Sequence, residues 1–487
     1  MSDDLTRLAN SVLWPGFFGT RAPEWLLTEL RHGLAGVVYF GQNVSEDLPL
    51  LSAEIRDANP AALIGIDEEG GSVTRLETGT GSTLPGAAQL GAIDDIAATT
   101  LVGAELARRV TAIGANVVLG PVADVNTNPQ NPVIGVRAFG SDDGLVSRHA
   151  VAMTAGIQGA GAAACVKHFP GHGDTNLDSH HSLPVIGLDT EEFERVHLAP
   201  FVAAVDAGVD MVMTAHIVVP EWGDAPATLN PAILGRLRAM GFTGVIVTDA
   251  LDMAAIRESI GIGEGAVRAL AAGADLLCIG NPTNPGAAML PDQDERDFHS
   301  ARDAIVRALA DGTLPVARVR EAAARNAALA AKLASSPAPA ADAPGFDDLA
   351  LRALAVSGTV PETSGPLFVV DSRRRPTLAV DSSVRYLVDV LRDGGASVRV
   401  DPDDADTGVP AVPADATAVL LVDRPALTSV QRTVAEGLRD AGVPGVIVNV
   451  GFPSHAEAPL PVIDVRAASR IGANAALARI RGLHDGR

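Results

Sequence analysis

The chain is poor in aromatic residues and cysteine, and each shortage limits how it can be built. Aromatic residues make up only 3% of the 487 residues, so any core must consist of Ala, Val, Leu and Ile, which a hydrophobic fraction of 47% can supply. The two cysteines, Cys165 and Cys278, lie in apolar, strand-like runs. In such runs a small buried residue is expected rather than a disulfide or a metal ligand. Neither cysteine requires an oxidising compartment.

Positive charge is also scarce, because 37 Lys and Arg stand against 59 Asp and Glu, for a formal net charge of −22. This excess repels the phosphates of nucleic acids and the anionic surface of membranes, so we expect neither as a partner. No apolar run reaches the length of a membrane span, and acidic residues follow Met1 where a signal peptide would be basic. We therefore expect a soluble, cytoplasmic protein.

Short apolar runs alternate with longer helical patterns through residue 334. The runs are too continuously apolar to have one solvated face, which favours a closed, parallel (β/α)8 TIM-like barrel. An open, doubly wound sheet is the alternative, and the lack of a G-x-G-x-x-G loop opening a helix weakens it. The eight runs are 12–18, 36–40, 62–67, 116–120, 162–167, 209–214, 244–248 and 274–279.

A stretch rich in Pro, Ala and Ser follows this pattern and is typical of an extended linker. Beyond it, strand and helix patterns restart and predict a smaller α/β sandwich with a mostly parallel sheet. We expect a barrel domain over residues 1–334, a linker over 335–347 and the second domain over 348–487. The second domain carries few candidate catalytic groups.

The densest group of titratable residues follows the fifth apolar run. Residues 167–184 hold one Lys, four His and two Asp. Burying so many polar groups in a core would cost several kcal/mol each unless they were paired. A polar surface loop is the alternative, but Asp178 and His180 are spaced to share one face of an extended segment. There the carboxylate can fix the imidazole tautomer and raise its basicity. The pattern indicates an active site.

Polar residues also follow several other predicted strands. The carboxyl ends of the strands form the active site of such a barrel. Asp249 ends the seventh run and is either the N-cap of the next helix or, facing the Asp178 and His180 pair, a nucleophile or base. Asp252, one helical turn further along, should contribute much less to catalysis than Asp249. The candidates at strand ends are Asp67, Arg75, Asn126, Arg137, Lys167, His168, His216 and Asp249.

Residues 167–184 resemble the K-H-F-P-G-H-G-D-T-x-x-D-S-H-x-x-L-P signature of the bacterial β-N-acetylglucosaminidases of glycoside hydrolase family 3, with a match at every fixed position. The family's other landmarks have counterparts in the same order along the barrel. The linker and second domain are similar to those of two-domain members. The counterparts are residues 67–71 with Arg75, 131–135 with Arg137, 214–216, and 248–249.

The resemblance implies a retaining exo-β-N-acetylglucosaminidase without cofactor or metal. It would remove terminal β-linked GlcNAc from a small glycoside, a muropeptide of peptidoglycan turnover or a chito-oligosaccharide, through a covalent glycosyl-enzyme. Asp249 matches the nucleophile, His180 the general acid/base and Asp178 its partner. The residues that match the sugar-binding set are Asp67, Arg75, Arg137, Lys167 and His168, and His216, from a further family motif, is grouped with them.

Three alternatives remain open. An imidazole repels an incoming phosphate less than a glutamate would, so phosphate could resolve the intermediate and make the protein a phosphorylase. A metal-dependent amidohydrolase would also be a barrel, but it would need an H-x-H pair at the end of the first strand, and residues 12–19 contain no His. An inactive sugar-binding module is disfavoured because nucleophile, acid and its partner are all present.

Overall fold

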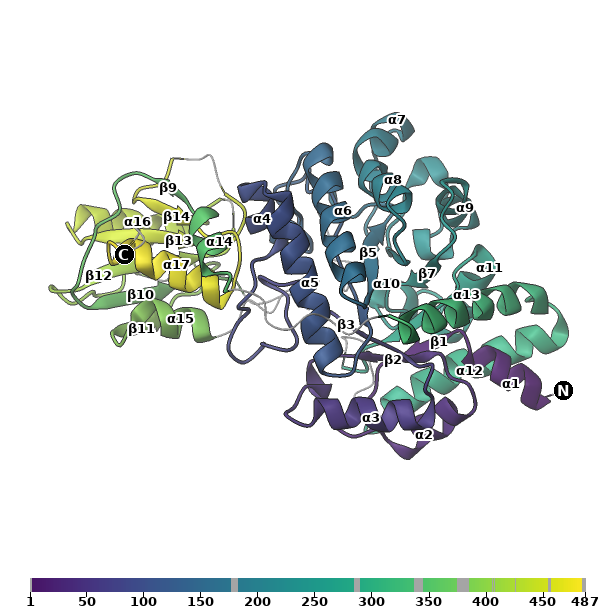
Figure 1. Cartoon of the computed structure of the whole chain (residues 1–487). Coiled ribbons are helices and arrows are strands. Elements are labelled where there is room, and N and C mark those ends of the chain that lie inside the picture. The colour runs from purple at the N-terminus through teal and green to yellow at the C-terminus, as the bar shows by residue number, and fades with distance from the viewer. Residues whose placement is uncertain are drawn as a thin grey trace. The chain divides into compact units, whose positions relative to one another are not determined.

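The computed structural model describes residues 2–176, 183–283, 290–336, 345–374, 385–404, 406, 408–424, 426–453 and 457–483. Its internal contacts divide the chain into two compact units (Figure 1). The first comprises Met1–Glu68, Thr99–Ile134 and Ser141–Ala343, and the second Glu69–Ala98, Gly135–Gly140 and Pro344–Arg487. The limits expected from sequence did not separate residues 69–98 and 135–140 from the rest of residues 1–334.

The first unit is built on parallel strands. Six form one sheet in the order β2-β3-β4-β5-β6-β7, and β1 pairs with β8. A parallel bridge between Val247 and Leu276 links β7 to the β8 segment, and β1 lies beside β2. This ring confirms the predicted (β/α)8 barrel. The strands are β1 (Leu13–Pro15), β2 (Gly36–Tyr39), β3 (Leu63–Ile66), β4 (Val117–Val118), β5 (Ala163–Phe169), β6 (Met211–Thr214), β7 (Val245–Thr248) and β8 (Leu277–Gly280).

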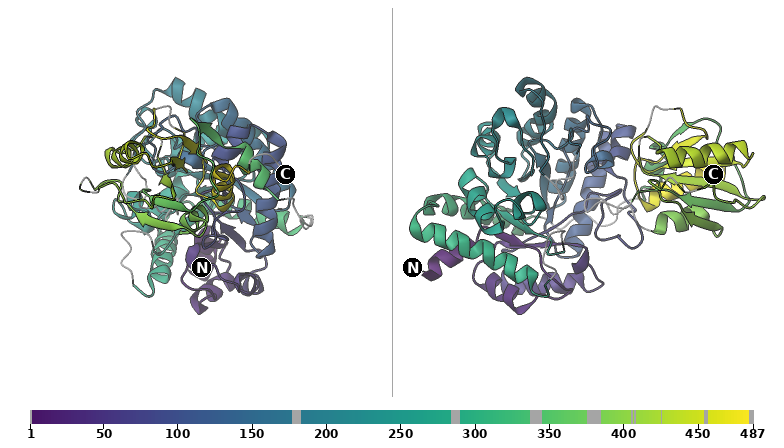
Figure 2. Two further views of the ribbon diagram at one scale, coloured as in Figure 1. Left: turned by 90° about the vertical axis from the view of Figure 1, so that its left-hand side faces the viewer. Right: turned by 180° about the vertical axis from the view of Figure 1, so that it is seen from behind.

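Helices follow the barrel strands and lie outside them, as the opposite views of Figures 1 and 2 show. Their apolar stripes cover the outer face of the sheet. In the first unit they are α1 (Ser2–Asn10), α2 (Glu24–Arg31), α3 (Leu48–Ala58), α5 (Ile96–Ala112), α6 (Asp143–Gly159), α7 (Thr190–Glu192), the π-helical η3 (Phe193–Leu198), α8 (Ala199–Asp206), α9 (Pro231–Ala239), α10 (Ala254–Arg257), α11 (Ile262–Ala272), α12 (Gln293–Asp311) and α13 (Val316–Ala334). The helix α4 (Ala87–Ile93) belongs to the second unit.

One of the few aromatic side chains fills the inside of the barrel. Trp14 is fully buried, and its indole N–H donates to the Leu63 carbonyl over 2.7 Å. A Cβ added to Gly65 would lie 2.4 Å from the indole ring, so glycine makes the room that Trp14 occupies. Cys165 and Cys278 belong to the same core and are buried and free, as expected.

The second unit contains a sheet in the order β11-β10-β12-β13-β14-β9, in which only β9 runs antiparallel to its neighbour. The mostly parallel sheet is therefore confirmed. The edge strand β9 has one partly exposed and two exposed residues and no periodicity that would predict it. Apolar clusters cover both faces of the sheet. The elements are α14 (Asp347–Arg352), β9 (Ala355–Ser357), β10 (Leu367–Asp371), α15 (Arg385–Arg392), β11 (Ala396–Arg399), β12 (Thr417–Val422), α16 (Ser429–Asp440), β13 (Gly445–Asn449), β14 (Val462–Asp464) and α17 (Arg470–Ile480).

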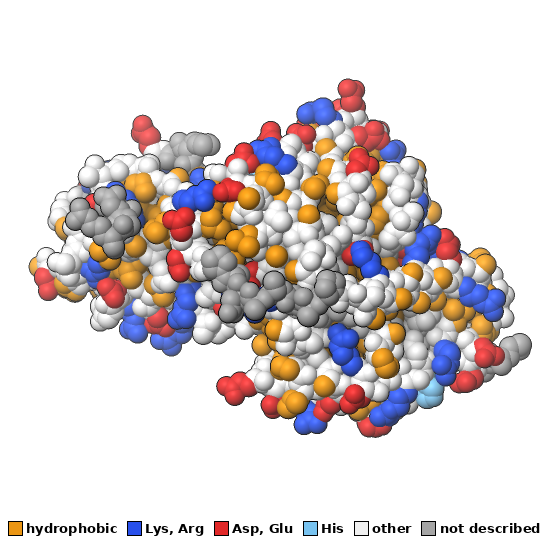
Figure 3. Space-filling model, viewed as in Figure 1, with side chains coloured by type: hydrophobic (Ala, Val, Ile, Leu, Met, Phe, Trp, Pro, Cys, Tyr) orange, Lys and Arg blue, Asp and Glu red, His pale blue; other side chains and the backbone are white. Residues whose placement is uncertain are grey.

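The surface charges are mixed despite the strong negative balance. On the face shown in Figure 3, acidic side chains are interspersed with Lys and Arg and with apolar side chains. Within the described residues, no helix combines the length and the apolar character that crossing a membrane requires.

Candidate active site

A bulge near the end of β5 aims two consecutive side chains at the strand ends. Between Val166 and Phe169 the pairing of β5 with β6 shifts by one residue. In a regular strand, neighbouring side chains point to opposite faces, whereas a bulge re-aims them. Lys167 and His168 both reach carboxylates as a result. The Lys167 ammonium lies 2.7 Å from Asp67 Oδ1, just beyond β3, and is only 2% exposed.

The partner of His168 is Asp124, which follows β4 and is completely buried. His168 Nδ1 donates to Asp124 Oδ2 over 2.7 Å, and Oδ1 accepts the backbone N–H of His172 over 2.6 Å. Burial by itself would raise the pKa of Asp124, but the charge and hydrogen bond of His168, followed by His172, hold that pKa below its usual range. The ionised carboxylate fixes the tautomer of His168 and anchors the start of the loop.

The described part of that loop is bound tightly to the barrel. Asn131 donates from its amide to the His172 carbonyl over 2.9 Å, and His172 Nδ1 lies 2.9 Å from Thr175 Oγ1. Burial lowers the pKa of His172 to about 4, so its ring is neutral at neutral pH. The predicted acid His180 and its partner Asp178 lie outside the described residues.

Asp249 directly follows β7 and is partly exposed. Its N–H donates to the Thr214 carbonyl over 3.1 Å, and its Oδ1 accepts the N–H of Ala250 over 2.8 Å. The next helix begins only at Ala254, with Met253 as its N-cap, so Asp249 is not a helix cap. The alternative role considered from sequence is thereby excluded.

The charges of the strand ends converge on the barrel interior. Burial is the main cause of the raised pKa of the Cys165 thiol, which Lys167 opposes and Asp67 and Asp249 reinforce. Burial likewise raises the pKa of Cys278, and the Asp249 carboxylate adds to this shift and also acts on His172. Asp67, Lys167 and Asp249 stand at or directly after the carboxyl ends of parallel strands of one barrel, and these strand ends share one end of the barrel.

His216 supports the segment after Asp249. The imidazole is fully buried, with Nε2 2.8 Å from the Ala250 carbonyl and Nδ1 3.0 Å from Thr228 Oγ1. A carbonyl only accepts hydrogen bonds, so Nε2 carries the hydrogen and donates it. The ring therefore ties the residue after Asp249 to the segment that follows β6.

Arg137 and Arg75 belong to the second unit. Arg137 is buried and forms a bidentate ion pair with Glu69, with Nε 3.0 Å from Oε2 and Nη2 2.8 Å from Oε1. Arg75 is partly exposed. The structure thus gathers Asp67, Lys167, His168, His216 and Asp249 in the first unit and the two arginines in the second.

Sequence reasoning missed the two carboxylates that orient these groups. Asp124 interrupts the apolar run of residues 117–125, and Glu69 directly follows Asp67 and Glu68. A charged residue inside an apolar run was the available signal for Asp124, since a buried charge needs a partner. Among the described residues, no group of three or more His, Cys, Asp or Glu is placed to hold a metal ion.

Residues 21–329 match the model of the glycosyl hydrolase family 3 N terminal domain. The chain belongs to glycosyl hydrolase family 3. It is therefore a glycoside hydrolase, and the resemblance of residues 167–184 to this family is confirmed.

Relatives within family 3 include proteins named for hexosaminidase activity. The chain is 34% identical over 286 residues to beta-hexosaminidase A of Pseudoalteromonas piscicida, which covers 53% of this chain and 47% of that protein. It is 36% identical over 271 residues to a beta-hexosaminidase of Xylella fastidiosa, and this match covers 53% of this chain and 79% of that protein. The chain thus spans about half the length of the first relative and most of the second.

A solved structure resembles nearly the whole chain. The glycoside hydrolase family 3 beta-N-acetylglucosaminidase from Paenibacillus sp. str. FPU-7 superposes with a TM-score of 0.82 at 28% identity. The match covers 98% of this chain and 97% of that one, so the similarity includes both units.

Proposed function

We propose that this chain is a retaining exo-β-N-acetylglucosaminidase that removes terminal β-linked GlcNAc through a covalent glycosyl-enzyme. The observation that carries the proposal is the partly exposed Asp249, which directly follows the barrel strand β7 at the same end of the barrel as the paired Lys167 and Asp67. The names of the three relatives above support an N-acetylated amino sugar as the substrate.

Asp249 is the nucleophile of this proposal. The N–H of Ala250 orients one carboxylate oxygen, and His216 holds the Ala250 carbonyl on the other side. The carboxylate attacks the anomeric carbon, the bond to the leaving oxygen breaks, and a glycosyl ester forms on the face opposite the aglycone. Water then attacks the anomeric carbon from the first face, the bond to the Asp249 carboxylate breaks, and the anomeric configuration is retained.

His180 is the general acid and base, with Asp178 as the group that steadies its imidazolium. The imidazolium protonates the leaving oxygen, and the neutral imidazole then takes a proton from the attacking water, which contributes about 10²–10⁴-fold. The assignment rests on the family signature. It gains support from the anchored start of the same loop, where Asp124 and Asn131 hold the His172 backbone.

Lys167, Asp67 and His168 are proposed to bind the sugar. Lys167 donates and Asp67 accepts, and such a pair is complementary to neighbouring hydroxyl groups that do both. His168 is held in one tautomer by Asp124. Substrate contacts by Arg75, Arg137 and His216 stay predictions from the family resemblance.

The stereochemical outcome tests the mechanism directly. A proton NMR time course with a β-linked GlcNAc substrate should show the β-anomer of free GlcNAc before mutarotation. The α-anomer appearing first would contradict a glycosyl-enzyme on Asp249.

Two further assays test the alternative reactions. In phosphate buffer, release of α- or β-GlcNAc 1-phosphate instead of free sugar would contradict hydrolysis and favour phosphorolysis. Activity that survives exhaustive chelation is expected, and its loss would favour the amidohydrolase.

Product analysis with two substrates tests which class of aglycone the enzyme prefers. We expect release of GlcNAc from both a muropeptide and chitobiose, with the higher kcat/KM marking the physiological class. A role in peptidoglycan turnover in the cytoplasm predicts preference for the muropeptide, and a clear preference for chitobiose would contradict that role.

A further inference from the structure

The parallel sheet of the second unit reverses its winding between β10 and β12. From β10 the chain passes to the neighbouring edge strand β11, then returns to the other side of β10 for β12, and β13 and β14 follow in order. Open parallel α/β sheets bind ligands outside the carboxyl ends of the strands at such a switch point. In this unit that place is the edge where β10 and β12 end.

Two short polar segments meet at that edge. Ser372 and Arg374 follow β10, while Asp423 and Arg424 follow β12. The N–H of Ser372 donates to the Leu421 carbonyl over 2.9 Å, and the N–H of Arg374 donates to Asp423 Oδ2 over 3.1 Å. These two bonds tie the end of β10 to the end of β12, so the residues that follow the two strands are neighbours.

Three polar atoms at this edge are buried without a hydrogen-bond partner in the described structure. They are Ser372 Oγ, Arg374 Nε and Asp423 Oδ1. Unpaired buried polar atoms are rare in folded proteins because they lose their water without replacement. One ligand could satisfy all three, if it offers an acceptor to the guanidinium, a donor to the carboxylate oxygen and either to the hydroxyl.

The edge also carries a guanidinium without a matching carboxylate. Arg373 pairs with Asp371 over 2.8 Å and Arg374 approaches Asp403 at 3.6 Å, but within the described ranges no carboxylate lies at ion-pair distance from Arg424. Arg399 shares Asp371 with Arg373. Burial, followed by the charge of Arg374, lowers the pKa of Arg424. An anion would relieve the repulsion between the two guanidinium groups.

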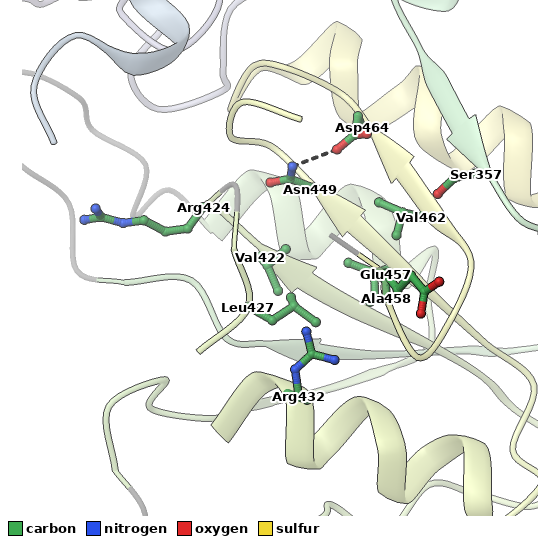
Figure 4. Close-up of a pocket in the computed structure, with 11 residues that line it drawn as sticks. Ser357, Val422, Arg424, Leu427, Arg432, Asn449, Glu457, Ala458, Val462 and Asp464 are labelled. Atoms are coloured by element: carbon green, nitrogen blue, oxygen red, sulfur yellow. Dashed lines mark hydrogen bonds between the residues drawn. The ribbon is translucent and has the colours of Figure 1, made fainter. Parts of the chain in front are cut away.

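Arg424 is also one of the residues that line a cavity next to this edge. That cavity, of about 40 Å³, lies beyond the ends of β12, β13 and β14 and is lined by Leu427, Arg432 and Val462 among others. In Figure 4 the side chain of Arg424 points away from these residues. The charges that act on its guanidinium are those of Arg374, Asp423 and Asp403.

We propose that this edge of the second unit binds inorganic hydrogen phosphate. Arg374, Arg424 and the Ser372 hydroxyl donate to the phosphate oxygens, and the remaining P–OH donates to Asp423 Oδ1. Sulfate has no proton at neutral pH, and a phosphate monoester, with a second pKa of about 6, has mostly lost its own. Neither can satisfy Asp423, so the site selects free phosphate. The inference does not depend on the proposed glycosidase reaction.

Calorimetric titration of the full-length protein with inorganic phosphate tests the proposal. We expect one saturable site, with sulfate bound about tenfold more weakly because a buried carboxylate oxygen then faces an anion without a donor. Arg424→Ala should weaken phosphate binding about tenfold or more, since it removes a charge-assisted contact. Arg432→Ala, which also removes an arginine near this edge, is the matched control and should leave the affinity for phosphate unchanged. Asp423→Asn should remove the preference over sulfate, because an amide N–H can donate to either anion.

Other results would overturn the proposal. These are the absence of saturable phosphate binding, equal affinity for phosphate and sulfate in the unsubstituted protein, or equal loss of binding in Arg424→Ala and Arg432→Ala. Binding that survives Arg424→Ala but disappears in Lys167→Ala would assign the phosphate to the barrel and would also overturn it. Arg424→Gln, which keeps most of the side-chain volume, serves as the test variant if Arg424→Ala does not fold.

Discussion

The buried ring of His172 predicts how the stability of the barrel depends on pH. Burial lowers the pKa of this histidine from 6.5 to about 4 in the folded chain. Between those two values the unfolded chain binds a proton at residue 172 that the folded chain does not bind. The free energy of unfolding therefore falls as the pH falls through this window. The contribution of His172 is complete above pH 6.5 and lost near pH 4.

The size of the effect follows from the width of the window. One pH unit corresponds to about 1.4 kcal/mol for one proton, so a window of about 2.5 units gives about 3 kcal/mol. This is a large part of the stability of an ordinary domain, which is about 5–15 kcal/mol. His172→Gln removes the titrating ring and should flatten the pH dependence by about that amount, whatever constant loss the substitution adds.

The barrel can be followed by itself in this experiment, because all three tryptophans, Trp14, Trp25 and Trp222, lie in the first unit. Urea unfolding, monitored by their fluorescence at several pH values between 4 and 7, gives the free energy of unfolding as a function of pH. The slope of this dependence is compared between the unsubstituted protein and His172→Gln. His299→Gln, at a partly exposed helix position, is the control and should keep the unsubstituted slope. Parallel curves for the unsubstituted protein and His172→Gln would refute the argument, since titrating groups away from residue 172 contribute equally to the slope of both proteins.

Four further predictions concern the site and the core. Asp249→Ala should abolish turnover of every glycoside, whereas Asp252→Asn should leave most of it; comparable losses in steady-state assays would contradict the assignment of the nucleophile. His180→Ala should damage substrates with poor leaving groups far more than activated aryl glycosides, whose departure needs no proton, and equal damage would exclude an acid role. Asp124→Asn should destabilise the barrel by about 3 kcal/mol in the fluorescence assay, because it breaks a buried charged pair, while Asp174→Asn, near the loop surface, should cost under about 0.5 kcal/mol. Gly65→Ala should cost about 1–3 kcal/mol in the same assay, since its methyl group would meet the Trp14 ring, and an unchanged midpoint would contradict that contact.

The sequence by itself determined the class of fold and the family. The predicted run 62–67 contains β3, and the run 244–248 contains β7, because strands buried on both faces are continuously apolar and stand out without any knowledge of their neighbours. The signature of residues 167–184 is likewise contained in one continuous stretch, so it can be recognised without any knowledge of the tertiary structure. The strand that escaped prediction, β9, is short and mostly exposed, so it leaves no pattern of burial in the sequence.

Only the tertiary structure decided which charged groups meet. His168 finds Asp124 across 44 residues of sequence, and Lys167 finds Asp67 across 100, because neighbouring strands of the barrel bring their ends together. Arg137 likewise finds Glu69 within the second unit. Hydrophobic periodicity records burial along the chain and carries no information about the neighbour across a sheet, so these pairs follow from the packing of distant segments.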